Sequence, residues 1–382
     1  MPLLPCLTSR RQWLQHVSLL AAGAAAPVWA QPAKPAAASR GVMVAQLVDF
    51  SSEQQDVSKD FLIGSRAAWQ DINAHGGIRG RRVEHIAVET DGTPASLRSA
   101  LASLKKDPSC VVLSGSVGDL LASQVAAMSR QGGLAIAHAA PWLQNSSLEV
   151  DDNTFPIFAG RQEQIAHALK NLSVMGMKEL GAVYANAREY AALHGEVERI
   201  AAGMQLKLQS FQGTGDTRLL GQKLTASTPA VLLFLGGTPE LAQFTQGLEK
   251  QARQRYILAL SDVNLQTLGQ MGAARNTPII ATQPVPLVNA SLAVARKYRE
   301  TLARLFDEPP NSLSLAGYIA ARYTFEVLNE IEGPLTRQSA LASFQRRASL
   351  DIGGFRINFN GQRRSGGYVT QSMMTQEGRL IG

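Results

Sequence analysis

Hydrophobic residues along the first part of the chain alternate between two spacings, which predict strands and helices in turn. Short apolar runs predict strands, and stretches in which apolar residues recur every three or four positions predict helices between them. The predicted strands are 42–47, 82–89, 110–113 and 134–137, and the predicted helices are 59–75, 94–105 and 119–130.

The same alternation restarts after a break near residue 160. The predicted strands of this second run are 180–184, 205–211, 231–235, 256–260 and 279–282, and its predicted helices are 162–175, 189–202, 217–226 and one that starts at Thr238-Pro239-Glu240. The C-terminal part differs in character. It predicts three helices and a strand-like end with a turn at Asn360-Gly361; these segments are 290–306, 312–332, 336–347 and 353–376.

Two runs of strand–helix alternation predict an α/β fold with two doubly wound parallel-sheet lobes. Ligands of such sheets bind beyond the carboxyl ends of the strands. Two lobes that face each other at those ends enclose a ligand cleft. The pattern alone does not say what the cleft binds.

Residues 1–30 have the layout of a signal peptide. Arg10-Arg11 precede an uncharged apolar stretch at 17–26, and Val28-Trp29-Ala30 has the small-x-small spacing of a cleavage site. The segment SRRQWL at 9–14 resembles the twin-arginine export motif, and an ordinary Sec signal with two arginines is the alternative. We therefore expect a periplasmic protein, with residues 31–40 as a Pro/Ala-rich tether.

Composition narrows the class further. The longest later apolar run, 230–235, is strand-sized, so we expect a soluble protein without stable membrane insertion. Cys6 leaves with the signal and only Cys110 remains, which excludes an intramolecular disulfide. The net charge of +7 falls to +5 when Arg10 and Arg11 leave, and the remaining basic residues are scattered, which argues against nucleic-acid binding.

Five short motifs then resemble one family. The segment DINAHGGIRGR at 71–81 is similar to the first helix–turn–strand of the periplasmic leucine/isoleucine/valine-binding protein family, the type I solute receptors of ABC importers. Matches follow in order at GTGD (213–216), PPNS (309–312), AGY (316–318) and GGFRINFNG (353–361), the last of which corresponds to a terminal hairpin. The paired glycines of the first motif stop a helix and allow positive φ.

The resemblance covers residues 41–382 and implies a type I periplasmic binding protein, whose two lobes close on a small organic ligand. It implies a first lobe of 41–158 and 286–348 and a second lobe of 159–285 and 349–382. It also implies a monomer that binds without catalysis, cofactor or metal. Its expected partners are a small-molecule ligand and either an ABC permease/ATPase complex or a membrane receptor.

Ser116, Val117 and Gly118 match the first-lobe segment that grips the ligand in this family. They lie between a predicted strand and a predicted helix, where free backbone N–H groups suit a carboxylate. An ordinary turn that caps the helix is the equal alternative. The Val117-Gly118 pair departs from the serines that are common in the family.

His138, Ala139, Ala140 and Trp142 match the segment that binds the ligand's head group, and Phe50 stands where it could wall the pocket. The usual Thr is absent from this segment. The resemblance implies an amino-acid-like ligand, whereas His138 and Trp142, which depart from the family pattern, suit an aromatic or acidic solute such as an aromatic carboxylate. A structural role for His138 is the alternative.

In the second lobe, the resemblance points to Tyr190, Gly237 and Asp262. Tyr190 corresponds to a tyrosine that covers the ligand, Gly237 allows close backbone approach after a strand, and Asp262 corresponds to the acid that pairs with a ligand amino group. Helix packing for Tyr190 and a plain turn for Asp262 are the alternatives.

We therefore expect an extracytoplasmic solute-binding protein of an ABC importer. A sensor subunit that presents a small molecule to a membrane receptor is the alternative, and an enzyme of unknown reaction is a weaker one. A signal replaces the N-terminal helix-turn-helix of a repressor with this fold. No H-x-x-x-H metal spacing occurs among the histidines of the predicted lobes, namely His75, His85, His138, His167 and His194.

Overall fold

The computed structural model describes residues 41–132, 134–174, 176–249, 251–272, 277–375 and 380–381. The predicted signal peptide and tether lie outside the described residues. Among the described residues, no helix is both long and apolar enough to cross a membrane.

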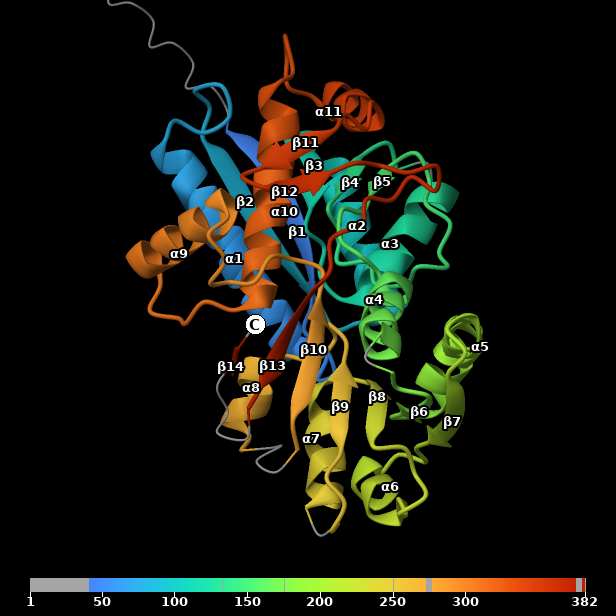
Figure 1. Ribbon diagram of the computed structural model, residues 1–382. Coiled ribbons are helices and arrows are strands. Elements are labelled where there is room, and N and C mark those ends of the chain that lie inside the picture. The colour runs from blue at the N-terminus through green and yellow to red at the C-terminus, as the bar shows by residue number, and fades with distance from the viewer. Residues whose placement is uncertain are drawn as a thin grey trace, which may run out of the picture. The chain divides into compact units, whose positions relative to one another are not determined.

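The first sheet has the strand order β2-β1-β3-β4-β5, and all its neighbouring strands pair in parallel (Figure 1). Its strands are β1 (Val42–Asp49), β2 (Val83–Thr90), β3 (Cys110–Ser114), β4 (Ala137–Ala139) and β5 (Thr154–Phe155). The helices between them are α1 (Gln55–Ala74), α2 (Pro94–Lys106) and α3 (Asp119–Gly132). The prediction is confirmed in order and type. It missed the two-residue β5 and started α1 four residues late, because the first turn of α1 is polar.

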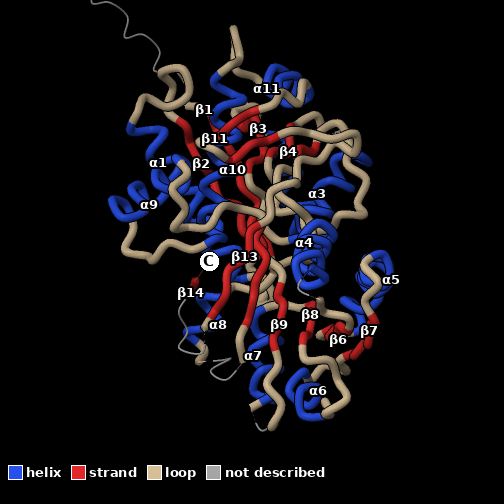
Figure 2. Tube along the Cα trace, viewed as in Figure 1, coloured by secondary structure: helices blue, strands red, loops and turns tan. Residues whose placement is uncertain are grey.

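The second sheet has the order β14-β13-β10-β9-β8-β6-β7. The strands β6 (Glu179–Tyr184), β7 (Lys207–Gln212), β8 (Val231–Leu235), β9 (Tyr256–Ala259) and β10 (Ile279–Gln283) pair in parallel, whereas β13 (Thr370–Met374) and β14 (Leu380–Ile381) add antiparallel. The helices of this run are α4 (Arg161–Val174), α5 (Ala187–Gly203), α6 (Thr217–Lys223), α7 (Thr238–Leu248) and α8 (Leu265–Gln270). Figure 2 shows helices lying around the strands, as expected of doubly wound sheets.

The C-terminal part contains the predicted turn at Asn360-Gly361 and, before it, a hairpin whose turn was not predicted. It contains α9 (Ala293–Leu305), α10 (Ser312–Asn329), α11 (Arg337–Gln345), β11 (Leu350–Ile352) and β12 (Phe355–Ile357). The turn between β11 and β12 is Gly353-Gly354, where φ is +57° and +98°, a conformation that glycine adopts without strain. Asn360-Gly361 makes only a local turn, because β13 pairs with β10 and not with β12.

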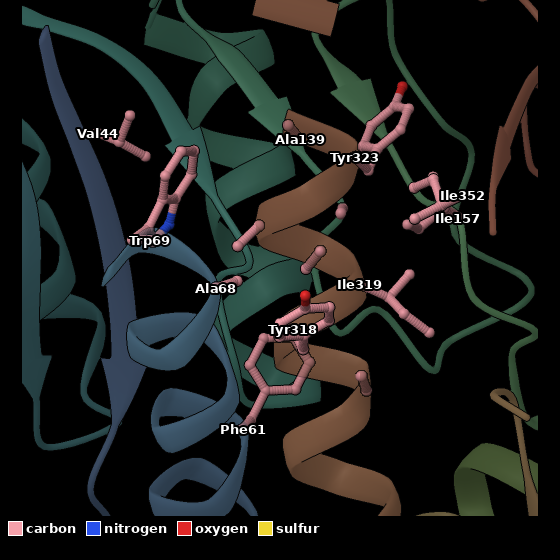
Figure 3. Close-up of a cluster of buried hydrophobic side chains, with 14 of the residues drawn as sticks. Val44, Phe61, Ala68, Trp69, Ala139, Ile157, Tyr318, Ile319, Tyr323 and Ile352 are labelled. Atoms are coloured by element: carbon pink, nitrogen blue, oxygen red, sulfur yellow. The ribbon is translucent and has the colours of Figure 1, made fainter. Parts of the chain in front are cut away.

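Helices α1 and α10 pack along each other in the core beside the first sheet, although they are far apart in sequence. Figure 3 shows Phe61 from α1 and Tyr318 and Ile319 from α10 in this cluster. The helices approach closely because Gly64 and Gly317 stand at the contact, each against the backbone of the other helix. The hairpin β11–β12 also packs into this cluster, although it belongs to the range 349–382 of the predicted second lobe.

Candidate functional site

A pocket opens between the turn before α1 and the loops after β6, β8 and β9 of the second sheet. The pocket has an empty volume of about 440 Å³, which includes the part that is open to solvent. From the α1 side it is lined by Glu53 and Gln54, and from the loop after β8 by Gly236 and Gly237. The pocket therefore lies at the carboxyl ends of the second sheet's parallel strands, where α/β sheets bind ligands.

Charged side chains dominate the lining of the pocket. Four carboxylates and two guanidinium groups face it, and they belong to Glu53, Glu189, Glu240, Asp262, Arg161 and Arg188. Leu193, Leu235 and Leu260 supply the apolar part. Among the described residues, no ion pair or hydrogen bond of the Glu240 side chain occurs. The lining thus carries an excess of negative charge, with one carboxylate uncommitted.

Arg161, the first residue of α4, bridges two carboxylates of different origin. Its Nη1 donates to Asp119 Oδ2 at 2.6 Å, and its Nε and Nη2 donate to the two oxygens of Asp262 at 2.8 and 2.9 Å. Asp119 begins α3 beside the first sheet, and Asp262 follows β9 of the second sheet. Burial opposes the charge of Arg161, yet Asp262 and Asp119 together raise its pKa well above the usual value. The three side chains are 13–17% exposed, so this is a largely buried ion-pair network, bidentate toward Asp262, that links the start of α3 to the loop after β9.

Glu189 lies at the edge of this bridge, in the first turn of α5. Burial raises the pKa of its carboxyl, while the positive charge of Arg161 lowers it. Arg188 donates to Glu189 at 3.4 Å and to Glu53 at 3.1 Å. The raised pKa indicates that the local cations do not fully offset the cost of burying this charge.

A buried network of side-chain amides and hydroxyls closes the space next to the bridge. Gln164 Nε2 donates to Gln144 Oε1 at 2.6 Å and to Ser261 Oγ at 2.9 Å. Thr282 Oγ1 donates to Gln164 Oε1 at 3.0 Å. Gln144 follows β4 of the first sheet, and the other residues surround the second sheet. This network therefore also joins the half of the molecule built on the first sheet to the half built on the second sheet.

The predicted residues Ser116, Val117 and Gly118 are buried and do not line the pocket. Val117 instead bonds the end of β1, since its N–H donates to the Leu47 carbonyl and its carbonyl accepts from the Asp49 N–H. Gly118 has φ of +108°, and a Cβ there would lie 2.7 Å from Asp49 Cβ. In this structure the segment fixes the edge of the first sheet.

Trp142, Ala139, Ala140 and Phe50 lie in or against the core of the first half and do not line the pocket. The Trp142 ring packs against Phe61 at 5.6 Å and Phe158 at 5.4 Å between centroids, and it is 2% exposed. The indole fills space inside this core.

Of the predicted second-lobe residues, Gly237 and Asp262 line the pocket and Tyr190 does not. The Tyr190 ring stacks on His194 at 4.3 Å and meets the edge of Tyr184 at 5.1 Å. The Asp262 carboxylate is already paired in this structure, because Arg161 binds both of its oxygens.

Most of the charged lining was not predicted from the sequence, above all Arg161, Arg188, Glu189 and Glu240. A signal was present for two of them. Glu189 and Glu240 lie in the first turns of α5 and α7, where acidic residues favour the helix dipole, and these first turns follow strands whose carboxyl ends face the pocket. Arg161 carried no local signal, because its partners are distant in sequence.

His138 lies on β4 with a fully buried side chain, and neither ring nitrogen has a hydrogen-bond partner among the described residues. Burial lowers the pKa of His138 from 6.5 to about 3. Between pH 6.5 and about pH 3, His138 is therefore protonated in the unfolded chain but neutral in the folded protein. The folded state loses stability as the pH falls from 6.5 toward 3.

A His138→Phe variant is expected to resist acid better than the wild type, because Phe fills similar space and does not titrate. Between neutral pH and about pH 4.5, the wild type should lose about 2–3 kcal/mol more free energy of unfolding than the variant. This follows from ~1.4 kcal/mol for each pH unit below the unfolded pKa of 6.5. Urea unfolding followed by Trp fluorescence at both pH values measures it. His75→Phe, at an exposed position, is the matched control, and equal acid sensitivity of wild type and His138→Phe would contradict the argument.

Comparisons with known proteins agree on the fold. A family model described as periplasmic binding protein matches residues 41–378. An extracellular ligand-binding receptor from Verminephrobacter eiseniae is 18% identical, with a TM-score of 0.80 over 90% of this chain and 100% of that chain. A possible leucine/isoleucine/valine-binding protein from Rhodopirellula baltica is 18% identical, with a TM-score of 0.78 over 90% and 97% of the two chains.

A third similar structure contains a ligand. The branched-chain amino acid transporter substrate binding protein from Streptococcus pneumoniae, solved in complex with isoleucine, is 14% identical, with a TM-score of 0.75 over 90% of this chain and 98% of that chain. A comparison with curated proteins finds no match.

Proposed function

Because the chain belongs to the periplasmic binding protein family, we propose that it captures a small polar solute outside the cytoplasm and delivers it to an ABC importer. The observation that carries this proposal is the pocket at the carboxyl ends of the second sheet's strands. Its lining includes residues of the turn before α1 as well as residues of the loops after β6, β8 and β9. The similar structure from Streptococcus pneumoniae holds isoleucine, which supports a solute of amino-acid size.

The charges of the pocket favour a solute that bears an amino group. Four lining carboxylates outnumber two guanidinium groups, and both of the latter are already paired. An aromatic carboxylate would meet this excess of negative charge, whereas an ammonium group would be attracted. Glu240, whose carboxylate is uncommitted among the described residues, is the first partner that we propose for it.

We propose capture by closure of two lobes, 41–158 with 286–348 and 159–285 with 349–382. The two sheets divide along these ranges, which supports the proposal. The hairpin β11–β12 packs with the first core and shifts the natural boundary toward β13. Export by the twin-arginine or the Sec route stays a prediction from residues 9–14, which lie outside the described residues.

The test is a thermal-shift panel on the purified protein with L-leucine, L-arginine, agmatine and benzoate as probes. We expect at least one amino-bearing probe to raise Tm, since a ligand at 100 times its Kd adds about 2.7 kcal/mol to the free energy of unfolding. Glu240→Gln should weaken that probe, whereas Glu149→Gln, at an exposed position on the first half, should not. A panel without any stabilising probe would overturn solute capture, and stabilisation by benzoate alone would overturn the amino-bearing class.

A further inference from the structure

Two carboxylates one helical turn apart on α1 face the second half of the molecule. Asp56 Oδ2 accepts a hydrogen bond from the Thr238 hydroxyl at 2.7 Å, and Asp60 Oδ2 accepts one from Asn264 Nδ2 at 2.7 Å. Residues four apart share a helix face, so both bonds come from the same side of α1. That side thus meets the start of α7 and the start of α8 together.

Thr238 and Asn264, which donate to these two carboxylates, are held in place and are hydrogen-bonded to each other. Thr238 is the first residue of α7 and Asn264 is the N-cap of α8, and the Asn264 N–H donates to Thr238 Oγ1 at 2.9 Å. Asn264 Oδ1 accepts from the backbone N–H groups of Gln266 and Thr267, which holds its side chain in place. Both partners are almost fully buried. The positive end of the α7 dipole also favours the Asp56 carboxylate opposite it.

On the α1 side, Asp60 has a second anchor. Asn311, the N-cap of α10, donates from Nδ2 to Asp60 Oδ2 at 3.0 Å and to Gln266 Oε1 at 3.2 Å. The Asp60 carboxylate is therefore oriented by Asn311 from the half built on the first sheet, and it accepts a hydrogen bond from Asn264 of the other half. The result is one continuous network that runs from α1 through α7 and α8 back to α10.

We propose that Asp56, Asp60, Thr238 and Asn264 form a latch that holds the two halves together in the closed arrangement of the cleft. None of the four lines the pocket, so the latch acts on closure and not on solute contact. The inference rests on the proposed function, because a latch has a role only if the cleft opens and closes around a solute.

The latch has the character of a contact that can open. Burial raises the pKa of Asp56 and of Asp60, while the hydrogen bonds from Thr238 and Asn264 lower them. The carboxylates thus give up hydration in the closed arrangement and regain it when the halves part. Because this desolvation cost offsets much of the hydrogen-bond gain, the network biases the closed arrangement without locking it.

The test measures the distance between the halves directly. Cys110, the one cysteine of residues 41–382, is buried, so nitroxide labels can be placed on introduced cysteines at exposed Lys106 of α2 and Leu219 of α6. Pulsed electron–electron double resonance then gives the distribution of distances between the two halves. We expect the double variant Asp56→Ala, Asp60→Ala to shift the closed-to-open ratio toward open by about tenfold.

Three further variants separate a latch from general damage. Asp60→Asn keeps an acceptor oxygen and should restore most of the closed population relative to Asp60→Ala. Thr238→Val removes the bond that Asp56→Ala removes and also the acceptor of the Asn264 N–H, so its effect in the Asp56→Ala background should be smaller than its effect alone. Gln70→Ala, which truncates an exposed residue of α1, is the matched control and should leave the distances unchanged.

A distance distribution that is the same in the wild type and in the Asp56→Ala, Asp60→Ala variant overturns the latch. So does an equal shift in Gln70→Ala. These outcomes are independent of the thermal-shift panel, because the distance measurement requires no solute. The distance measurement therefore tests the latch, the thermal-shift panel tests solute capture, and failure of one can be distinguished from failure of the other.

Discussion

A Gly317→Ala variant is expected to lose more than about 3 kcal/mol of folding free energy, toward the upper end for overpacked cores. A Cβ at this position would lie 1.9 Å from the carbonyl oxygen of Phe61 and 2.8 Å from its carbon, both backbone atoms of α1. No side-chain rotation relieves such a clash, so the helices must move apart. Gly64→Ala is expected to do the same, since its Cβ would lie 1.6 Å from the Ser314 carbonyl oxygen.

Equilibrium urea unfolding, or the yield of folded protein where unfolding is too advanced, measures this loss. Gly195→Ala on α5 is the matched control, because a Cβ there meets nothing within 4 Å. That variant should be neutral or more stable by up to about 1 kcal/mol, the difference in helix propensity between Ala and Gly. A Gly317→Ala protein as stable as Gly195→Ala would show that α1 and α10 do not touch as described.

An Arg161→Ala variant should be destabilised by about 3–5 kcal/mol at neutral pH, as is usual when one partner of a buried ion pair is removed. It would leave Asp119 and Asp262, whose side chains are 17% and 13% exposed, without the cation that both bind. Denaturant unfolding of the variant and the wild type at neutral pH measures the loss.

Two companions test the cause of the Arg161→Ala deficit. Arg161→Lys keeps the charge but not the bidentate geometry, so its loss should be intermediate. The triple variant Arg161→Met, Asp119→Asn, Asp262→Asn removes the charges together and should be more stable than Arg161→Ala alone. If instead the triple variant is the less stable of the two, the bridge is not the source of the loss.

The order and type of most elements could be predicted because they depend on local periodicity. The strands β1, β3, β6 and β8 are apolar runs bounded by polar loops, and the helices between them show apolar spacing. The prediction failed where an element is too short for a pattern, as at β5 and α8. It placed the turn at Asn360-Gly361 correctly but missed the hairpin turn at Gly353-Gly354, because a turn sequence does not decide which strands pair across it.

The site was harder to predict because its geometry depends on long-range contacts. Gly237 and Asp262 follow strands that end at the pocket and line it in this structure, and their contact with a ligand stays a prediction. Trp142 and His138 occupy positions where the resemblance implied ligand contact, yet in this structure they are core residues. The pairing of Arg161 with Asp119 and Asp262 joins segments 42 and 101 residues away from it, and nothing in the local sequence reveals such a partner.

The packing of α10 on α1 also constrains how the molecule is made. Helix α1 is synthesised early, but the helix that covers its glycine-lined face begins only at Ser312. Likewise β10 must wait for β13, which begins at Thr370, to cover its free edge. A chain that emerges from its N-terminus therefore leaves this face of α1 uncovered until α10 is made, and the edge of β10 open until β13 is made. We expect each half to complete its packing only after these C-terminal segments have been synthesised.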